Sequence, residues 1–140
     1  MHSAGVVEKK GKIMKISGLA HIGVFVSDLE RSIAFYRDIL GFEVRHQNEI
    51  DGIKVAFISL GDLTLELILS PEEVSKRSDG IVAHIAMEVS GIEAVAAALK
   101  EKGIVFEGDI FFAEHFWTKG SKWITFRGPD NEHLELTEVL

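Results

Sequence analysis

The chain has 140 residues, no cysteine and a formal net charge of −7, a length that fits one domain with its own hydrophobic core. The absence of cysteine excludes a disulfide framework and a thiolate metal site, and it is compatible with the cytoplasmic location that we expect. The acidic balance disfavours a nucleic-acid partner. No apolar run reaches the ~18 residues of a membrane helix. We therefore expect a small-molecule partner.

Residues 1–15 have the composition of a polar leader. The segment lacks the continuous apolar stretch of a signal peptide, and Met14 stands directly before the first predicted strand. We expect residues 16–140 to form the folded domain.

The first half of the domain, residues 16–69, predicts the order β-α-β-β-β. Strand segments are rich in β-branched and aromatic residues, the helix shows apolar residues at helical spacing before Gly41, and Asp51-Gly52 is a hairpin turn pair. The expected elements are a strand over 15–27, a helix over 28–40, and strands over 42–48, 53–60 and 63–69.

The second half, residues 80–140, repeats this order after a polar linker at 70–79. The expected elements are a strand over 81–90, a helix over 91–102, strands over 105–112, 122–127 and 133–139, and a loop over 113–121. The fold class is therefore α+β, with two βαβββ modules that form a curved mixed sheet and carry their helices on its outer face.

The two halves carry the same chemical groups in equivalent places. When His84 is laid over His21, Val89 falls on Val26 and the next residue, Ser90, on Ser27. Each copy opens with a strand histidine and closes with a strand glutamate. The two pairs are His21 with Glu66 and His84 with Glu135.

This repeated pattern predicts a site for a divalent metal. Two neutral imidazoles and two carboxylates balance the charge of a +2 ion, and two buried carboxylates without an ion would repel each other. Four protein ligands leave two positions of an octahedral ion open to substrate oxygens. We expect Ni²⁺ or Zn²⁺ on His21, Glu66, His84 and Glu135, with Co²⁺ or Mn²⁺ also accepted.

Each of these residues has an alternative interpretation when it is taken alone. A single strand histidine is more often structural than a ligand, and a glutamate in an apolar strand can lie on a solvated face. The two-fold repetition favours the metal site. His133 shares a face with Glu135 and is a solvated residue, a support for the site or a substrate contact. Two other histidines, His46 and His115, are expected in loops or on the surface. Four aromatic residues are expected first in the core or a dimer contact and second as pocket walls: Phe111, Phe112, Phe116 and Trp117.

Four segments resemble the vicinal oxygen chelate superfamily and are most similar to its glyoxalase I (lactoylglutathione lyase) branch: 21–44, 65–69, 84–89 and 128–138. The resemblance implies paired βαβββ modules, a homodimer, and Ni²⁺ or Zn²⁺ on the same four residues. It also implies a lyase that acts on the thiol adduct of an α-oxo aldehyde such as methylglyoxal through a metal-stabilised enediolate. Glu135 is then the first candidate for proton transfer and Glu66 the second.

Three positions depart from the branches of that superfamily. Phe25 and Ser70 stand where glutathione-using enzymes commonly carry an Arg and an Asn, which removes the expected glutathione anchors. Val55 stands where methylmalonyl-CoA epimerases use an additional carboxylate base, which argues against epimerisation by that route. An epimerase, a dioxygenase, a transferase and a non-catalytic protein that binds a small ligand such as an antibiotic therefore remain alternatives.

Overall fold

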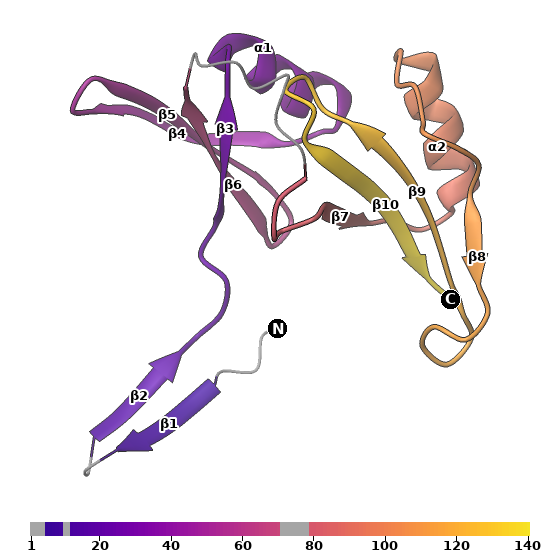
Figure 1. The fold of residues 1–140 in the computed structure, drawn as a ribbon, viewed down its shortest axis with the longest axis horizontal. Helices are drawn as coiled ribbons and strands as arrows, with labels where there is room; N and C mark the ends of the chain where they lie inside the picture. Colours follow the sequence, from indigo (N-terminus) through magenta and orange to yellow (C-terminus); the bar gives the residue numbers. More distant parts are fainter. Residues whose placement is uncertain (1–4, 10–11, 71–78) are drawn as a thin grey trace.

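The computed structural model describes residues 5–9, 12–70 and 79–140 (Figure 1), with side chains from residue 16 onward apart from residue 50. Its elements are β1 (Gly5–Lys9), β2 (Lys12–Ile16), β3 (Ile22–Val26), α1 (Leu29–Ala34), η1 (Phe35–Ile39), β4 (Glu43–Ile50), β5 (Ile53–Leu60), β6 (Leu63–Leu69), β7 (Ile85–Glu88), α2 (Ile92–Glu101), β8 (Phe111–Ala113), β9 (Ser121–Arg127) and β10 (His133–Val139).

The first module is a four-stranded sheet in the order β3-β6-β5-β4. Its first and last strands, β3 and β6, are parallel neighbours, and the other pairs are antiparallel. The β4–β5 hairpin turns at Asp51 and Gly52, whose φ angles of 52° and 81° are the two positive values that a type I′ turn requires. The strand order and this turn agree with the sequence prediction.

The predicted helix over 28–40 forms as two parts. Asp28 caps α1 because its carboxylate accepts a hydrogen bond of 3.0 Å from the Arg31 N–H. The chain then widens into the π-helical segment η1, where the Leu40 N–H donates to the Phe35 carbonyl. Gly41, at φ 84°, ends the helix as expected.

The second module has the order β7-β10-β9-β8, with β7 and β10 parallel. The strand predicted over 105–112 is wrong for most of its length. An isolated bridge joins Phe106 to Phe126, and regular pairing resumes only at β8. The polar segment 107–109 separates these two pairings.

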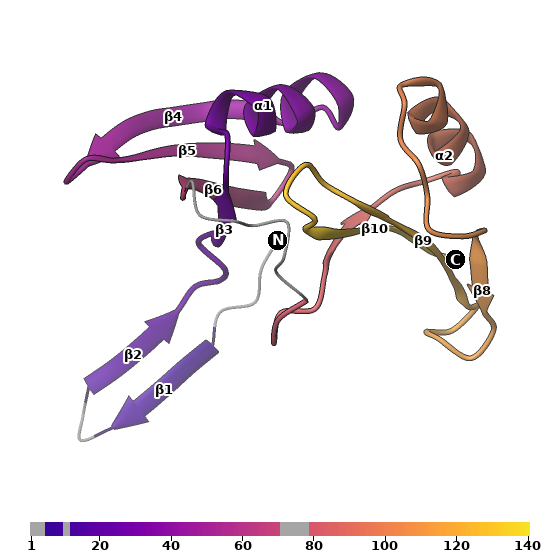
Figure 2. The same cartoon turned by 45° about the horizontal axis from the view of Figure 1, so that its top comes forward.

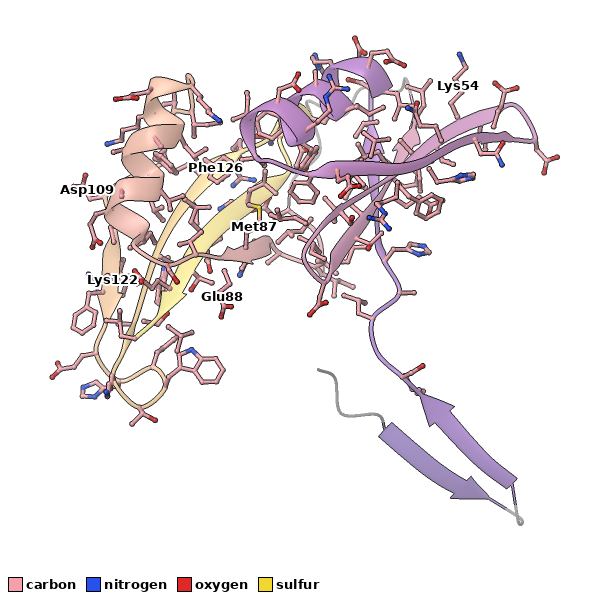
Figure 3. The ribbon with its side chains drawn as sticks, turned by 180° about the vertical axis from the view of Figure 1, so that it is seen from behind. Lys54, Met87, Glu88, Asp109, Lys122 and Phe126 are labelled. Carbon is pink, nitrogen blue, oxygen red and sulfur yellow. The ribbon has the colours of Figure 1, made fainter. Side chains whose placement is uncertain are left out.

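The modules form two separate sheets rather than one continuous sheet, and α1 and α2 lie on the same side of them (Figure 2). Side chains alternate between the two faces of each strand. Figure 3 shows Met87 and Glu88 projecting from opposite sides of β7. Met87 belongs to the core beneath the helices, so Glu88 marks the open face. The α+β class with two βαβββ modules is confirmed.

Strands β1 and β2 form an antiparallel hairpin within the segment predicted as a polar leader. The hairpin stands away from both modules (Figures 1 and 2). No helix of the described residues is both long and apolar enough to cross a membrane.

The turn before β10 ties the second module to the first. The Asp130 carboxylate is buried and accepts hydrogen bonds from the Ser27 N–H and hydroxyl and from the Arg31 guanidinium, the last at 3.1 Å. Beside it, the fully buried Tyr36 hydroxyl donates to Glu132 at 2.8 Å. Burial, followed by the charge of Glu132, raises the pKa of Tyr36 well above its usual value.

We expect Tyr36→Phe to lower the free energy of unfolding at pH 7 by about 1.5–3 kcal/mol, the range for a hydrogen bond to a charged group. Urea titration followed by circular dichroism measures this loss. Because the folded-state pKa is raised, the protonated phenol stabilises the fold fully below its unfolded pKa of about 10, and this contribution falls as the pH rises above that value. The variant should therefore lose less stability between neutral and alkaline pH. Equal stability and equal alkaline slopes would contradict the role given to this contact.

Candidate metal centre

The first candidate half-site lies where β3 and β6 run side by side. Glu66 pairs in register with Gly23, and His21 stands just before β3. The His21 Nε2 atom lies 3.4 Å from Glu66 Oε1, with side-chain exposures of 41% and 21%. Both side chains are therefore reachable from solvent and aim at a common point, as two ligands of one ion do.

The second half-site repeats this arrangement between β7 and β10. Glu135 pairs in register with Ala86, and His84 stands just before β7. The His84 Nε2 atom lies 3.8 Å from Glu135 Oε1, with exposures of 45% and 15%. The structure thus brings the four predicted residues together as two pairs.

The two pairs do not meet within one chain. Among the described residues, which include all four candidates, no three His, Cys, Asp or Glu side chains are grouped closely enough to hold a metal ion. Each pair belongs to its own sheet. Each chain therefore presents two incomplete sets of two ligands.

A polar network surrounds the second half-site. The His133 ring lies edge-on to the His84 ring with centroids 5.9 Å apart, and its Nε2 atom is 3.1 Å from Glu107 Oε1. Its Nδ1 atom lies 3.6 Å from Asp79 Oδ2. Arg127 pairs with both carboxylates. His133 is thus held beside a candidate ligand, which agrees with the supporting role weighed from the sequence.

The ion pairs in this network alter the acidity of its carboxyl groups. The hydrogen bond from Arg127 lowers the pKa of Asp79. Burial opposes ionisation of Glu107, but hydrogen bonds from Thr125 and Arg127 outweigh it and lower the pKa of that carboxyl. Both groups are therefore anionic at neutral pH. The sequence analysis missed Asp79, Glu107 and Arg127 because charged residues far apart in the chain give no pairing signal.

The first half-site has aromatic rather than ionic neighbours. The Phe57 ring lies edge-on to the His21 ring at 5.3 Å, and the His46 ring lies 6.3 Å from Phe57 on its other side. His46 stands opposite Phe57 in the β4–β5 ladder and thus shares its face. It was predicted as a loop or surface residue, and the structure places it on a strand that shares its sheet face with the half-site.

A pocket of about 350 Å³ lies where the modules meet, between β3, residues 79–85 and the turn at 130–133. Phe25 and His84 are among its lining residues. Val55, the position examined for an additional base, is buried at 4% exposure and supplies no polar group. Position 55 therefore offers no acid–base group, whereas histidines, glutamates and Asp79 lie near the half-sites.

The donor set fits a divalent ion of borderline hardness, such as Zn²⁺, Ni²⁺, Co²⁺ or Mn²⁺. In each pair an imidazole nitrogen and a carboxylate oxygen lie within one ion's reach of each other. Each carboxylate also has a second oxygen that can accept a proton or another hydrogen bond.

Comparison with known proteins gives one family. The sequence model of the Glyoxalase/Bleomycin resistance protein/Dioxygenase superfamily matches residues 18–136. Human mitochondrial methylmalonyl-CoA epimerase is 34% identical over 103 residues, which cover 67% of this chain and 58% of that protein. Ethylmalonyl-CoA/methylmalonyl-CoA epimerase of Cereibacter sphaeroides is 39% identical over 97 residues, covering 63% of this chain and 72% of that protein.

Among solved structures, the fosfomycin resistance protein FosX of Listeria monocytogenes, complexed with Mn(II) and sulfate, superposes with a TM-score of 0.68. The alignment covers 89% of this chain and 94% of that one at 22% identity, so it supports the fold alone. The family match extends across both βαβββ modules and includes all four candidate ligands. The chain belongs to the Glyoxalase/Bleomycin resistance protein/Dioxygenase superfamily, which is the vicinal oxygen chelate superfamily that its sequence resembles.

Proposed function

We propose that this protein is a metal-dependent epimerase that inverts the carbon between the thioester and the carboxylate of a 2-substituted malonyl-CoA. The observation that carries the proposal is the pair of matching His–Glu half-sites. They occur in a chain that is 34–39% identical to epimerases of this substrate class. The match spans 58% of the human relative's length.

The relatives favour epimerisation over the glyoxalase I reaction predicted from the family resemblance. Phe25 is an apolar side chain at 55% exposure where a glutathione-using enzyme would carry a cation. The argument against epimerisation was that Val55 stands where related epimerases use an additional carboxylate base. Inversion of a carbon centre requires a base, but that base can stand at another position in the chain, so this argument loses force. The lyase acting on a thiol adduct of methylglyoxal becomes the alternative to be assayed.

Inverting a carbon centre requires a proton to leave one face and another to arrive at the opposite face. Glu66 and Glu135 suit this pair of transfers because they come from different modules and would flank a bound substrate from two sides. A glutamate that binds through one oxygen keeps the other for the proton. Glu135 is slightly more buried than Glu66, at 15% against 21% side-chain exposure, so its carboxylate is less hydrated.

A divalent ion on His21, Glu66, His84 and Glu135 would polarise the substrate's carbonyl oxygens and so make the proton between them more acidic. The chain's own contribution is to hold these four donors, with His133 packed beside His84. Ni²⁺, Zn²⁺, Co²⁺ and Mn²⁺ all suit this donor set.

We also propose that the centre is completed across a homodimer, with the first half-site from one chain and the second from its partner. The supporting observation is the separation of the two pairs among the described residues. A C₂ dimer supplies each half-site twice, so it forms two complete centres. Without a second copy, each ion would have only two protein ligands, fewer than stable sites of this kind use.

Metal binding is the first test. Elemental analysis of the purified protein should find about one divalent ion per chain, because each complete centre uses one set of four ligands. His21→Ala and His84→Ala should each lose the ion, although the two residues lie in different modules. His115→Ala, in the exposed loop over 114–119, is the matched control and should retain it. Full metal occupancy in either half-site variant would exclude the four-ligand centre.

The reaction is tested by proton exchange. The metal-loaded protein in D₂O should exchange the C2 proton of methylmalonyl-CoA, which mass spectrometry detects as a gain of one deuterium. Glu135→Gln and Glu66→Gln should each slow the exchange about 10²–10⁴-fold, the usual contribution of a general acid or base. No exchange by the metal-loaded protein, together with lactoyl-thiol formation from methylglyoxal and a thiol, would establish the lyase instead.

Mixing two inactive variants tests the shared centre. His21→Ala and His84→Ala homodimers should both be inactive, but a mixed dimer has one centre built from two intact half-sites. Random reassortment of equal amounts should recover roughly a quarter of the wild-type exchange rate, since half of the dimers are mixed and each holds one good centre. Zero recovery in dimers shown by differential tags to have mixed would place the whole centre within one chain.

A further inference from the structure

An aromatic cluster with no assigned role lies on the second module. It consists of Phe111 on β8, Trp123 on β9 and Phe116 in the loop between them. The Phe111 and Trp123 rings have centroids 4.9 Å apart at 44°, and Phe116 lies 5.4 Å from Trp123 at 41°. Phe111 and Phe116 are each 56% exposed, although large aromatic rings usually bury most of their surface.

The cluster lies on the same sheet face as the second half-site. Ile124 and Phe126 point into the core, so the residues that alternate with them, including Trp123, point to the open face. Glu135 pairs with Thr125, and Thr137 pairs with Trp123. Glu135 and Trp123 are therefore diagonal neighbours on adjacent strands, about 7–8 Å apart at their Cα atoms.

This position favours the pocket-wall role that was expected second for Phe111 and Phe116 over the core or dimer contact that was expected first. A group that extends from a molecule bound at Glu135 toward the neighbouring strand β9 would meet Trp123, and the next strand, β8, carries Phe111 opposite Trp123. Phe111 and Phe116 expose more than half of their surface, and such aromatic surfaces favour offset or tilted stacking with another flat ring. The adenine of coenzyme A is a weaker fit because a long, flexible arm separates it from the thioester.

We propose that Phe111, Phe116 and Trp123 form the binding site for a flat, apolar group carried on the reacting carbon of the substrate. The inference rests on the proposed function and narrows its substrate class to malonyl-CoA thioesters whose C2 substituent is an aryl-type group larger than methyl. The name of the Cereibacter relative, which pairs ethylmalonyl-CoA with methylmalonyl-CoA, shows that this substituent varies among relatives.

The chain contains its own reporter for the test, because its two tryptophans are Trp117 and Trp123. In the Trp117→Phe variant, Trp123 is the only indole. Titration of this metal-loaded variant with benzylmalonyl-CoA should change the Trp123 emission at about tenfold lower concentration than titration with methylmalonyl-CoA, the gain expected from stacking and burial of one ring. Adding Phe111→Ala or Phe116→Ala should bring the two dissociation constants close together.

Phe112→Ala is the matched control. Phe112 neighbours Phe111 on β8 and is also exposed, but strand alternation places it on the other face, where its ring packs over Gly120. This variant should keep the tenfold preference. Equal affinities for the two thioesters in the Trp117→Phe variant would overturn the proposal. So would an equal emission change with 3′,5′-ADP alone, which would assign the cluster to adenine, or dissociation of the dimer in Phe111→Ala, which would make it a subunit contact.

Binding is read by fluorescence whether or not the substrate reacts, so the two proposals can fail separately. A tenfold preference without exchange of the C2 proton would retain the aromatic site and reject the epimerase. Exchange on methylmalonyl-CoA without any preference would retain the epimerase and reject the aromatic site.

Discussion

Parallel pairing of the first and last strands in each module is the constraint on which the candidate centre depends. Helix α1 connects β3 to β4 and α2 connects β7 to β8, so each helix covers one face of its sheet and leaves the other face open. The registers of Glu66 with Gly23 and of Glu135 with Ala86 then bring each glutamate to the histidine that precedes its neighbouring strand. A two-ligand half-site therefore results from the module's topology, and the duplicated chain contains it twice.

The contact between the modules determines how the two half-sites are arranged within one chain. The Asp130 carboxylate accepts hydrogen bonds from the Ser27 N–H and hydroxyl and from the Arg31 guanidinium at the start of α1. The helix dipole also favours a negative charge at this end of the helix. Asp130 is only 8% exposed. If one of its hydrogen-bond partners were removed, little water could reach the carboxylate to take that partner's place. This junction joins the modules while each His–Glu pair stays in its own sheet, and the proposed homodimer would unite one pair from each chain.

The sequence predicted the parts that are fixed locally. The Asp51-Gly52 turn, the helix end at Gly41 and the strand β10 follow from residue chemistry and periodicity, and the repeat identified the His–Glu pairs. The sequence could not predict which polar residues meet across the fold, such as Arg127 with Asp79, because these pairs depend on tertiary packing. The aromatic residues around Trp123 were expected first in the core or a dimer contact because hydrophobicity does not reveal which face a helix covers. The strand over 105–112 failed because its polar middle breaks the ladder, although its apolar ends match a strand.

The two modules are alike in their candidate ligands and unlike in what surrounds them. Beside His21 stand Phe57 and His46, whereas beside His84 stand His133 and an ionic network anchored by Arg127. A metal ion needs only the two matching His–Glu pairs, because these pairs supply the same types of ligand from both modules. A substrate whose reacting carbon carries a thioester, a carboxylate and a third group has no such symmetry, so its surroundings must differ from one side to the other. For the proposed substrate, the residues that differ between the modules outside the His–Glu pairs are therefore the candidates for recognising its three unlike groups.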